Sequence, residues 1–171
     1  MTNEQATFLA EQFVSLMSGE VATTLKVLKA VTEDGRAYRP DEKSRTAWEL
    51  ATHIAQADVW FLDSVIHGRF ARNAEGAASQ LASFKTPADV VAFYEREVPA
   101  RLDAIRAMPP EDLTRIVDFF GMVQWPAVKF LGLANNHGIH HRGQLAGYLR
   151  AMGSRVPAIY GGSADEPFKA S

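Results

Sequence analysis

Hydrophobic residues recur every three or four positions along four long stretches of the chain, which is the spacing of amphipathic helices. The first stretch runs from Asn3 to Val31, and the second from Thr46 to His67. The third begins at Thr86 and ends before Pro109, and the fourth extends from near Pro126 to Met152. The pattern predicts an all-α fold in which these four helices pack as a four-helix bundle.

Local signals mark several ends of these helices. Thr46 and Glu49 form a capping-box pattern at the start of the second helix. Thr86 followed by Pro87 is typical of an N-cap and the first helical position. Gly153 suits the position just after the fourth helix, where glycine is the residue most often found.

Polar or turn-rich segments separate the four helices. Residues 33–43 are charged and break the first helix, and residues 69–85 predict a long surface connection. Residues 113–124 are β-branched and aromatic, which favours a strand-like or turn-rich connector. Glycine and proline predict an extended tail over residues 154–171. We expect a single domain, residues 1–171, with long connections and an extended C-terminal tail.

Composition narrows the classes of function. The chain has 171 residues, a formal net charge of −2 and no cysteine, so disulfides, thiolate ligands and a cysteine nucleophile are excluded. No basic stripe indicates nucleic-acid binding, and no Lys/Arg cluster indicates a membrane surface. The apolar runs are shorter than a membrane span, and the N-terminus lacks signal-peptide features. A cytoplasmic protein is the expectation.

Histidines supply the candidate chemistry. His137 and His141 are spaced i, i+4, which places two side chains on one helix face about 5–6 Å apart at Cβ. His53, on the apolar second helix, could supply a third ligand. His140 lies at the margin of the face and is interpreted as a neighbour. The combination predicts a three-histidine metal site between the second and fourth helices.

Helical phase adds three more candidate residues. Gln144 and Tyr148 fall on the same inward strip as His137 and His141, whereas Arg142 points away. Glu49 precedes His53 by one turn and could complete the cap, accept a hydrogen bond near the site or serve as a fourth ligand. Three neutral imidazoles with an open position suit Zn²⁺ or Ni²⁺, with Fe²⁺, Co²⁺ and Mn²⁺ as alternatives.

Simpler interpretations of the same residues exist. A lone histidine on an apolar face is more often a hydrogen-bonded core residue, and paired histidines also occur on solvated faces. The combination of all three in a cysteine-free bundle favours the ligand interpretation. Other metal motifs are absent, because Gly138 follows His137 where a zincin motif needs glutamate, and no two helices carry Glu-x-x-His.

Three segments in this order resemble the DinB-like metal-binding superfamily. They are Ala47–His53, His137–Leu145, and Tyr148–Gly153 followed by Val156-Pro157. That superfamily includes thiol-dependent S-transferases and isomerases and many members without assigned activity. The resemblance implies a four-helix bundle in which His53, His137 and His141 bind one divalent ion, often in a homodimer.

These observations lead to competing functional hypotheses. The first is a metal-dependent enzyme acting on a small molecule, most simply an S-transferase using a low-molecular-weight thiol, with Gln144 and Tyr148 orienting the activated group. The second is a metal-dependent hydrolase with Glu49 as the base. The third is a non-catalytic metal- or ligand-binding stress-response module, in which the ion is structural or captures a ligand.

Overall fold

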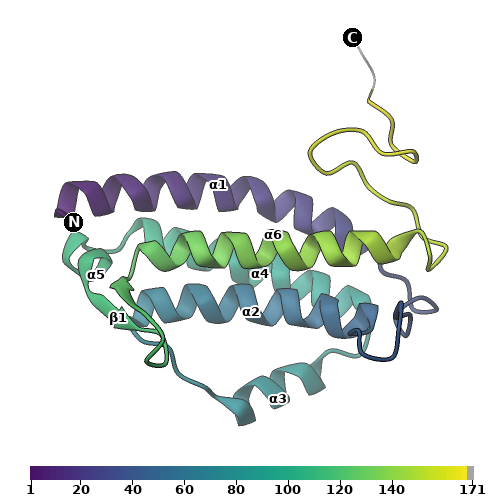
Figure 1. The fold of residues 1–171 in the computed structure, drawn as a ribbon, viewed down its shortest axis with the longest axis horizontal. Helices are drawn as coiled ribbons and strands as arrows, with labels where there is room; N and C mark the ends of the chain where they lie inside the picture. Colours follow the sequence, from purple (N-terminus) through teal and green to yellow (C-terminus); the bar gives the residue numbers. More distant parts are fainter. Residues whose placement is uncertain (169–171) are drawn as a thin grey trace.

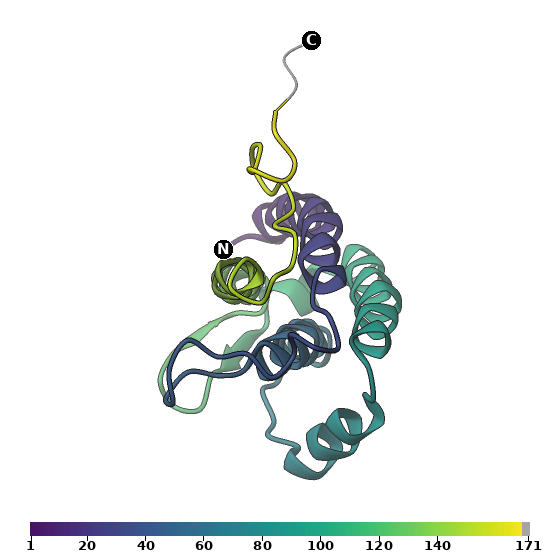
Figure 2. The same ribbon diagram turned by 90° about the vertical axis from the view of Figure 1, so that its right-hand side faces the viewer.

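Four long helices form the body of the protein in a computed structural model that describes residues 1–168. They are α1 (Asn3–Lys29), α2 (Ala47–His67), α4 (Pro87–Arg106) and α6 (Lys129–Leu149). Each of α1 and α2 packs against both α4 and α6, so the four helices lie at the corners of a bundle when viewed end-on (Figures 1 and 2). The predicted all-α four-helix bundle is confirmed.

Helix starts follow the capping chemistry that the sequence predicted. The Thr46 Oγ1 accepts from the Glu49 backbone N–H, and the Glu49 carboxylate accepts from Thr46 N. Thr86 and Asp89 form the same reciprocal pair at α4, with Pro87 directly after Thr86. Such boxes satisfy backbone donors that have no partner within the helix. The first helix also has one, at Thr2, which the sequence reading did not identify.

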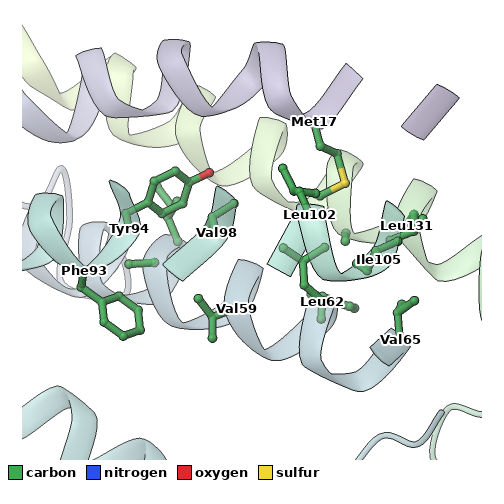
Figure 3. Packing of buried hydrophobic residues seen from close by; sticks show 14 of the residues in the cluster. Met17, Val59, Leu62, Val65, Phe93, Tyr94, Val98, Leu102, Ile105 and Leu131 are labelled. Atoms are coloured by element: carbon green, nitrogen blue, oxygen red, sulfur yellow. The ribbon is translucent and has the colours of Figure 1, made fainter. Parts of the chain in front are cut away.

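The core is a continuous apolar cluster contributed by all four long helices. Figure 3 shows part of it, with side chains of α2 and α4 meeting those of α1 and α6. The labelled residues are Met17, Val59, Leu62, Val65, Phe93, Tyr94, Val98, Leu102, Ile105 and Leu131. Burial of these side chains supplies most of the driving force for bundle formation.

The segment between α2 and α4 differs from the prediction. The irregular connection expected over residues 69–85 contains a helix, α3 (Ala74–Ser83), which lies apart from the bundle in both views (Figures 1 and 2). Asn73 caps it by accepting from Gly76 N, and alanine favours the helical backbone. Its sequence carries no apolar stripe that would predict a helix, and none of its residues is buried in the structure.

A small hairpin replaces the connector before α6. After the short helix α5 (Pro110–Thr114), strands β1 (Ile116–Asp118) and β2 (Gln124–Pro126) pair antiparallel, which confirms the strand-like prediction. The tip holds Phe120 at φ +54° and Gly121 at φ +75°, a left-handed turn that suits glycine far better than phenylalanine. The helix α5 was not predicted.

The last helix is shorter than predicted at both ends. It begins at Lys129 because Pro126 belongs to β2, and it ends at Leu149 rather than Met152. Gly153 has φ +76°, as its predicted stop position requires, and residues 154–168 contain no helix or strand. This tail contacts the bundle through Tyr160, and its described end lies away from the bundle (Figures 1 and 2). Residues 169–171, the last of the predicted tail, lie outside the described part. No helix within residues 1–168 is long and apolar enough to cross a membrane.

Candidate metal centre

The three predicted histidines meet on one side of the bundle. His53 lies on α2, and His137 and His141 lie one turn apart on the neighbouring helix α6. One ring nitrogen from each lies within 4.8 Å of the other two. The centroids of the three rings are 4.5 to 5.0 Å apart. The structure therefore brings together the three histidines that the sequence grouped as candidate ligands.

The spacing of the ring nitrogens fits one ion. His53 Nε2 and His137 Nε2 are 3.2 Å apart, close enough for one ring to donate to the other. Two nitrogens bound tetrahedrally to one zinc at about 2.0–2.1 Å lie roughly 3.3 Å apart. The observed pair already has this separation, and all three ring nitrogens lie within 4.8 Å of one another.

Electrostatics keep these imidazoles neutral. Burial lowers the pKa of His53 to about 3 and that of His137 to about 4, and it also lowers the pKa of His141. The positive charge of Arg45 adds to the lowering at each of the three rings. Neutral imidazole is the form that binds a metal ion, so the site needs no deprotonation at neutral pH.

Gln144 contacts a predicted ligand directly. Its Oε1 lies 2.7 Å from His141 Nδ1. Because an amide oxygen can only accept, Nδ1 carries the proton and the lone pair of His141 is on Nε2. Hydrogen bonds of this kind commonly orient metal-binding histidines. His140 is exposed, as expected of a neighbour.

The strip that carries these residues faces differently from the prediction. We expected His137, His141, Gln144 and Tyr148 to point inward, but Gln144 is exposed and the other three are only half-buried. The buried face of α6 is formed by other residues: Phe130, Leu131, Ala134, Gly138, Arg142, Leu145 and Leu149. The histidine strip therefore lies at the flank of α6 that meets α2, at the partly exposed edge of the core.

Two other predicted residues have separate partners. The Glu49 carboxylate is held by Thr46 in the helix cap, which lowers the pKa of Glu49, and it is not part of the histidine group. Tyr148 packs edge-on against Tyr38, with ring centroids 5.6 Å apart. Tyr38 belongs to the connection between α1 and α2. This connection projects on the same side of the bundle as the hairpin (Figure 2), but it lies at the other end of the helices (Figure 1).

Sequence reasoning missed a polar group inside the bundle. Arg142 is only 2% exposed, and its guanidinium donates to Glu20 and to the Tyr160 hydroxyl. Asp58 is 4% exposed and accepts a 2.8 Å hydrogen bond from the Tyr94 hydroxyl. Two features of the sequence could have indicated this group. Asp58 interrupts an otherwise apolar run, and Arg142 lies on a different face of its helix from the histidines.

Comparisons with known proteins agree with this architecture. The family model described as the DinB family matches residues 1–168. YjoA of Bacillus subtilis, an uncharacterized protein, is 29% identical over 155 residues, covering 88% of this chain and 96% of YjoA. Its crystal structure, that of a DinB-like protein, aligns at 26% identity over 92% of this chain and 96% of that one, with a TM-score of 0.67.

Two further crystal structures share the fold. A DinB-like protein from Bacillus cereus is 26% identical over 88% of this chain and 97% of its own, with a TM-score of 0.72. A protein from Exiguobacterium sibiricum is 21% identical over 85% of this chain and 92% of its own, with a TM-score of 0.62. Because the protein from Exiguobacterium sibiricum is only 21% identical, its similarity to this chain concerns the fold alone.

Proposed function

Since this chain belongs to the DinB family, we propose that it binds one divalent metal ion through His53, His137 and His141 and acts as a metal-dependent enzyme on a small molecule. The observation that carries the proposal is the convergence of three neutral imidazoles from two helices. Within residues 1–168 no carboxylate or fourth histidine joins the group. Three protein ligands with an open position are typical of catalytic rather than structural zinc sites.

Among metal-dependent reactions we propose S-transfer from a low-molecular-weight thiol. A divalent ion supplies Lewis acidity that lowers the pKa of a thiol or water in its open position. The chain has no cysteine, so the thiol must come from a small molecule. Gln144 fixes the tautomer of His141, and the half-buried flank leaves the site accessible to solutes.

A hydrolase is the weaker alternative. It would need a general base, and Glu49 was the predicted candidate. The lowered pKa of Glu49 and its engagement in the cap make it a poor base. We retain Tyr148 as a candidate to orient the substrate, because it lies on the same helix face and packs against the connection that borders the site.

Metal content tests the first part of this proposal. We propose Zn²⁺ or Ni²⁺ as the ion, with Fe²⁺, Co²⁺ and Mn²⁺ as alternatives. Purified protein, dialysed after loading with each ion, should retain one equivalent, and His53→Ala and His137→Ala should retain almost none. The matched control is His140→Ala, an exposed histidine on the same helix that should bind as the wild type does. Failure of the wild type to retain any ion would overturn the site.

Turnover tests the second part. Metal-loaded and metal-free protein should be compared for consumption of an electrophilic chloroarene with glutathione, bacillithiol, mycothiol or coenzyme A. We expect turnover with at least one thiol, only in the loaded form, and loss in His141→Ala. Stoichiometric metal without turnover with any thiol would favour the stress-response module, in which the ion is structural or captures a ligand. Hydrolysis without a thiol would favour the hydrolase.

We further propose a cytoplasmic homodimer. Two large apolar side chains on α1, Phe8 and Leu16, are 60% and 58% exposed. Exposed apolar surface of this kind is often covered by a second subunit. Light scattering should give twice the monomer mass, and Phe8→Glu with Leu16→Glu should reduce it. A monomer at every concentration tested would contradict this assembly.

A further inference from the structure

A polar chamber lies inside the bundle, next to α6. We use this name for the space lined by the polar side chains of Glu20, Thr24, Asp58, Tyr94, Asn135 and Arg142 together with Met17, Val98, Ala134, Gly138 and Ile139. All four long helices contribute. Glu20 and Thr24 lie on α1, Asp58 lies on α2, Tyr94 lies on α4, and Asn135 and Arg142 lie on α6. Figure 3 shows Tyr94 beside Val98 within the apolar core. The chamber is therefore a polar island among hydrophobic side chains.

Most polar atoms of the chamber have protein partners. Tyr94 donates its hydroxyl proton to Asp58 Oδ2 at 2.8 Å. Arg142 donates to Glu20 and, at 3.3 Å, to Thr24 Oγ1. These bonds come from different helices, so the chamber connects the whole bundle. The positive charge of Arg142 offsets the negative charge of Glu20, and it also lowers the pKa of Asp58, which burial raises to about 7.

One buried side-chain atom of the chamber has no protein partner. Asp58 Oδ1 is buried, and no donor within residues 1–168 reaches it. A carboxylate oxygen without a hydrogen bond in the interior costs about 1–3 kcal/mol or more, because its hydration has been lost. Native proteins rarely leave such atoms without a partner, and an internal water is a common solution.

We propose that the polar chamber binds a single water molecule, which donates a hydrogen bond to Asp58 Oδ1 and is a fixed component of the fold. The free space among the lining residues is about 10 Å³ measured to the centre of a water molecule, close to the room that one water requires. Asn135 brings an amide donor, and Thr24 and Tyr94 bring hydroxyl oxygens. Buried waters make about three such bonds.

The same observations disfavour other occupants. A metal ion would lie in a chamber that already holds the guanidinium of Arg142, a repulsion that water does not suffer. An organic ligand would not fit the free space. The chamber also shares no residue with the histidine group, so the water is proposed independently of any metal on His53, His137 and His141.

Water–protein NMR tests this proposal with the full chain. We expect negative cross-relaxation between water and the Hα protons of Gly138, which lines the chamber, as a long-lived internal water produces. Exchange through the Thr24 and Tyr94 hydroxyls could imitate the signal. Asp58→Leu keeps both hydroxyls and removes the acceptor, so we expect it to abolish the signal. Persistence of the signal in folded Asp58→Leu would overturn the proposal.

Two further measurements test the proposal if Asp58→Leu does not fold, or if the occupant of the chamber is a cation instead of water. If Asp58→Leu does not fold, Asp58→Asn retains an acceptor oxygen and should retain the signal, whereas its loss would count against the water. A crystal structure should show one density peak within hydrogen-bonding distance of Oδ1. No peak would overturn the proposal, and so would a peak that becomes an anomalous scatterer after exchange of K⁺ for Tl⁺, because the occupant would then be a cation.

Discussion

At the scale of single residues, the histidine group owes its chemistry to small, local contacts. His141 presents Nε2 because Gln144 engages Nδ1, and His53 and His137 are neutral because they are partly removed from water. The i, i+4 spacing predicted that His137 and His141 share one helix face, and the apolar second helix offered His53 as the third member. It did not predict the contact of Gln144, because side-chain rotamers are set by neighbours that a helical wheel does not contain.

Removal of the Gln144 amide should weaken metal binding without unfolding the protein. We expect Gln144→Leu to lower zinc affinity by about 10- to 100-fold, the usual cost of losing a group that orients a ligand. Gln144→Glu keeps an acceptor for the His141 N–H and should bind nearly as the wild type does. Competition with a chromophoric chelator measures both. Equal affinity of Gln144→Leu and the wild type would show that the contact has no orienting role.

The metal-free protein should lose stability in acid through its buried histidines. The folded-state pKa values of His53 and His137, about 3 and 4, lie below the ordinary value of 6.5. Between these limits the unfolded chain binds more protons, so the unfolding free energy falls as the pH is lowered from about 6.5 to 4. Urea titrations should show a shallower fall for the variant His53→Gln/His137→Gln. An identical pH dependence would contradict the lowered pKa values.

At the scale of elements, the close approach of α2 and α6 depends on a residue without a side chain. A Cβ at Gly138 would lie 3.1 and 3.2 Å from the carboxylate oxygens of Asp58. The absence of that atom lets α6 pack on α2 one residue away from His137. The capping motifs of α2 and α4 were predictable because they are local, whereas this contact joins two distant segments. The helix α3 was missed because nothing in it is buried.

Gly138→Ala should crowd the Asp58 carboxylate between α6 and α2, because the added Cβ would lie 3.1 Å from one of its oxygens. We expect a loss of about 1–3 kcal/mol in unfolding free energy, typical of overpacking, together with weaker metal binding. Gly143→Ala is the matched control on the same helix, because nothing lies within 4 Å of its added Cβ. Alanine there should stabilise the protein by roughly 0.5–1 kcal/mol. Thermal denaturation with and without zinc distinguishes them, and equal effects at both positions would refute the packing argument.

At the scale of the whole molecule, one buried cation connects the bundle to its tail. The Arg142 guanidinium is bound by Glu20, 122 positions earlier, and by Tyr160 in the tail. The Tyr160 hydroxyl in turn donates to Glu20 at 2.9 Å. The sequence predicted that Arg142 points away from the histidines, but not that it is buried. A charged residue is normally assigned to the surface, and its partner could not be identified at such separation.

Tyr160→Phe should release the tail while leaving the bundle folded. The loss of one hydroxyl between charged groups is expected to cost about 1 kcal/mol. Limited proteolysis should cut the variant faster than the wild type within residues 150–168, with the four-helix core remaining resistant. Tyr38→Phe, which changes a tyrosine outside this network, is the control. Unchanged cleavage of Tyr160→Phe would mean that the hydroxyl does not hold the tail.

The separation of His53 and His137 by 84 positions has a consequence for the unfolded chain. An ion held by both residues would act as a removable cross-link in a protein that has no cysteine for a permanent one. Closing a loop of this size reduces the conformational entropy of the unfolded state, by about 4–5 kcal/mol for a covalent bridge. The closed loop would contain α3, α4, α5 and the hairpin and leave α1 and the tail outside. Removing the ion with a chelator would return conformational freedom to that loop in the unfolded chain and so lower the unfolding free energy.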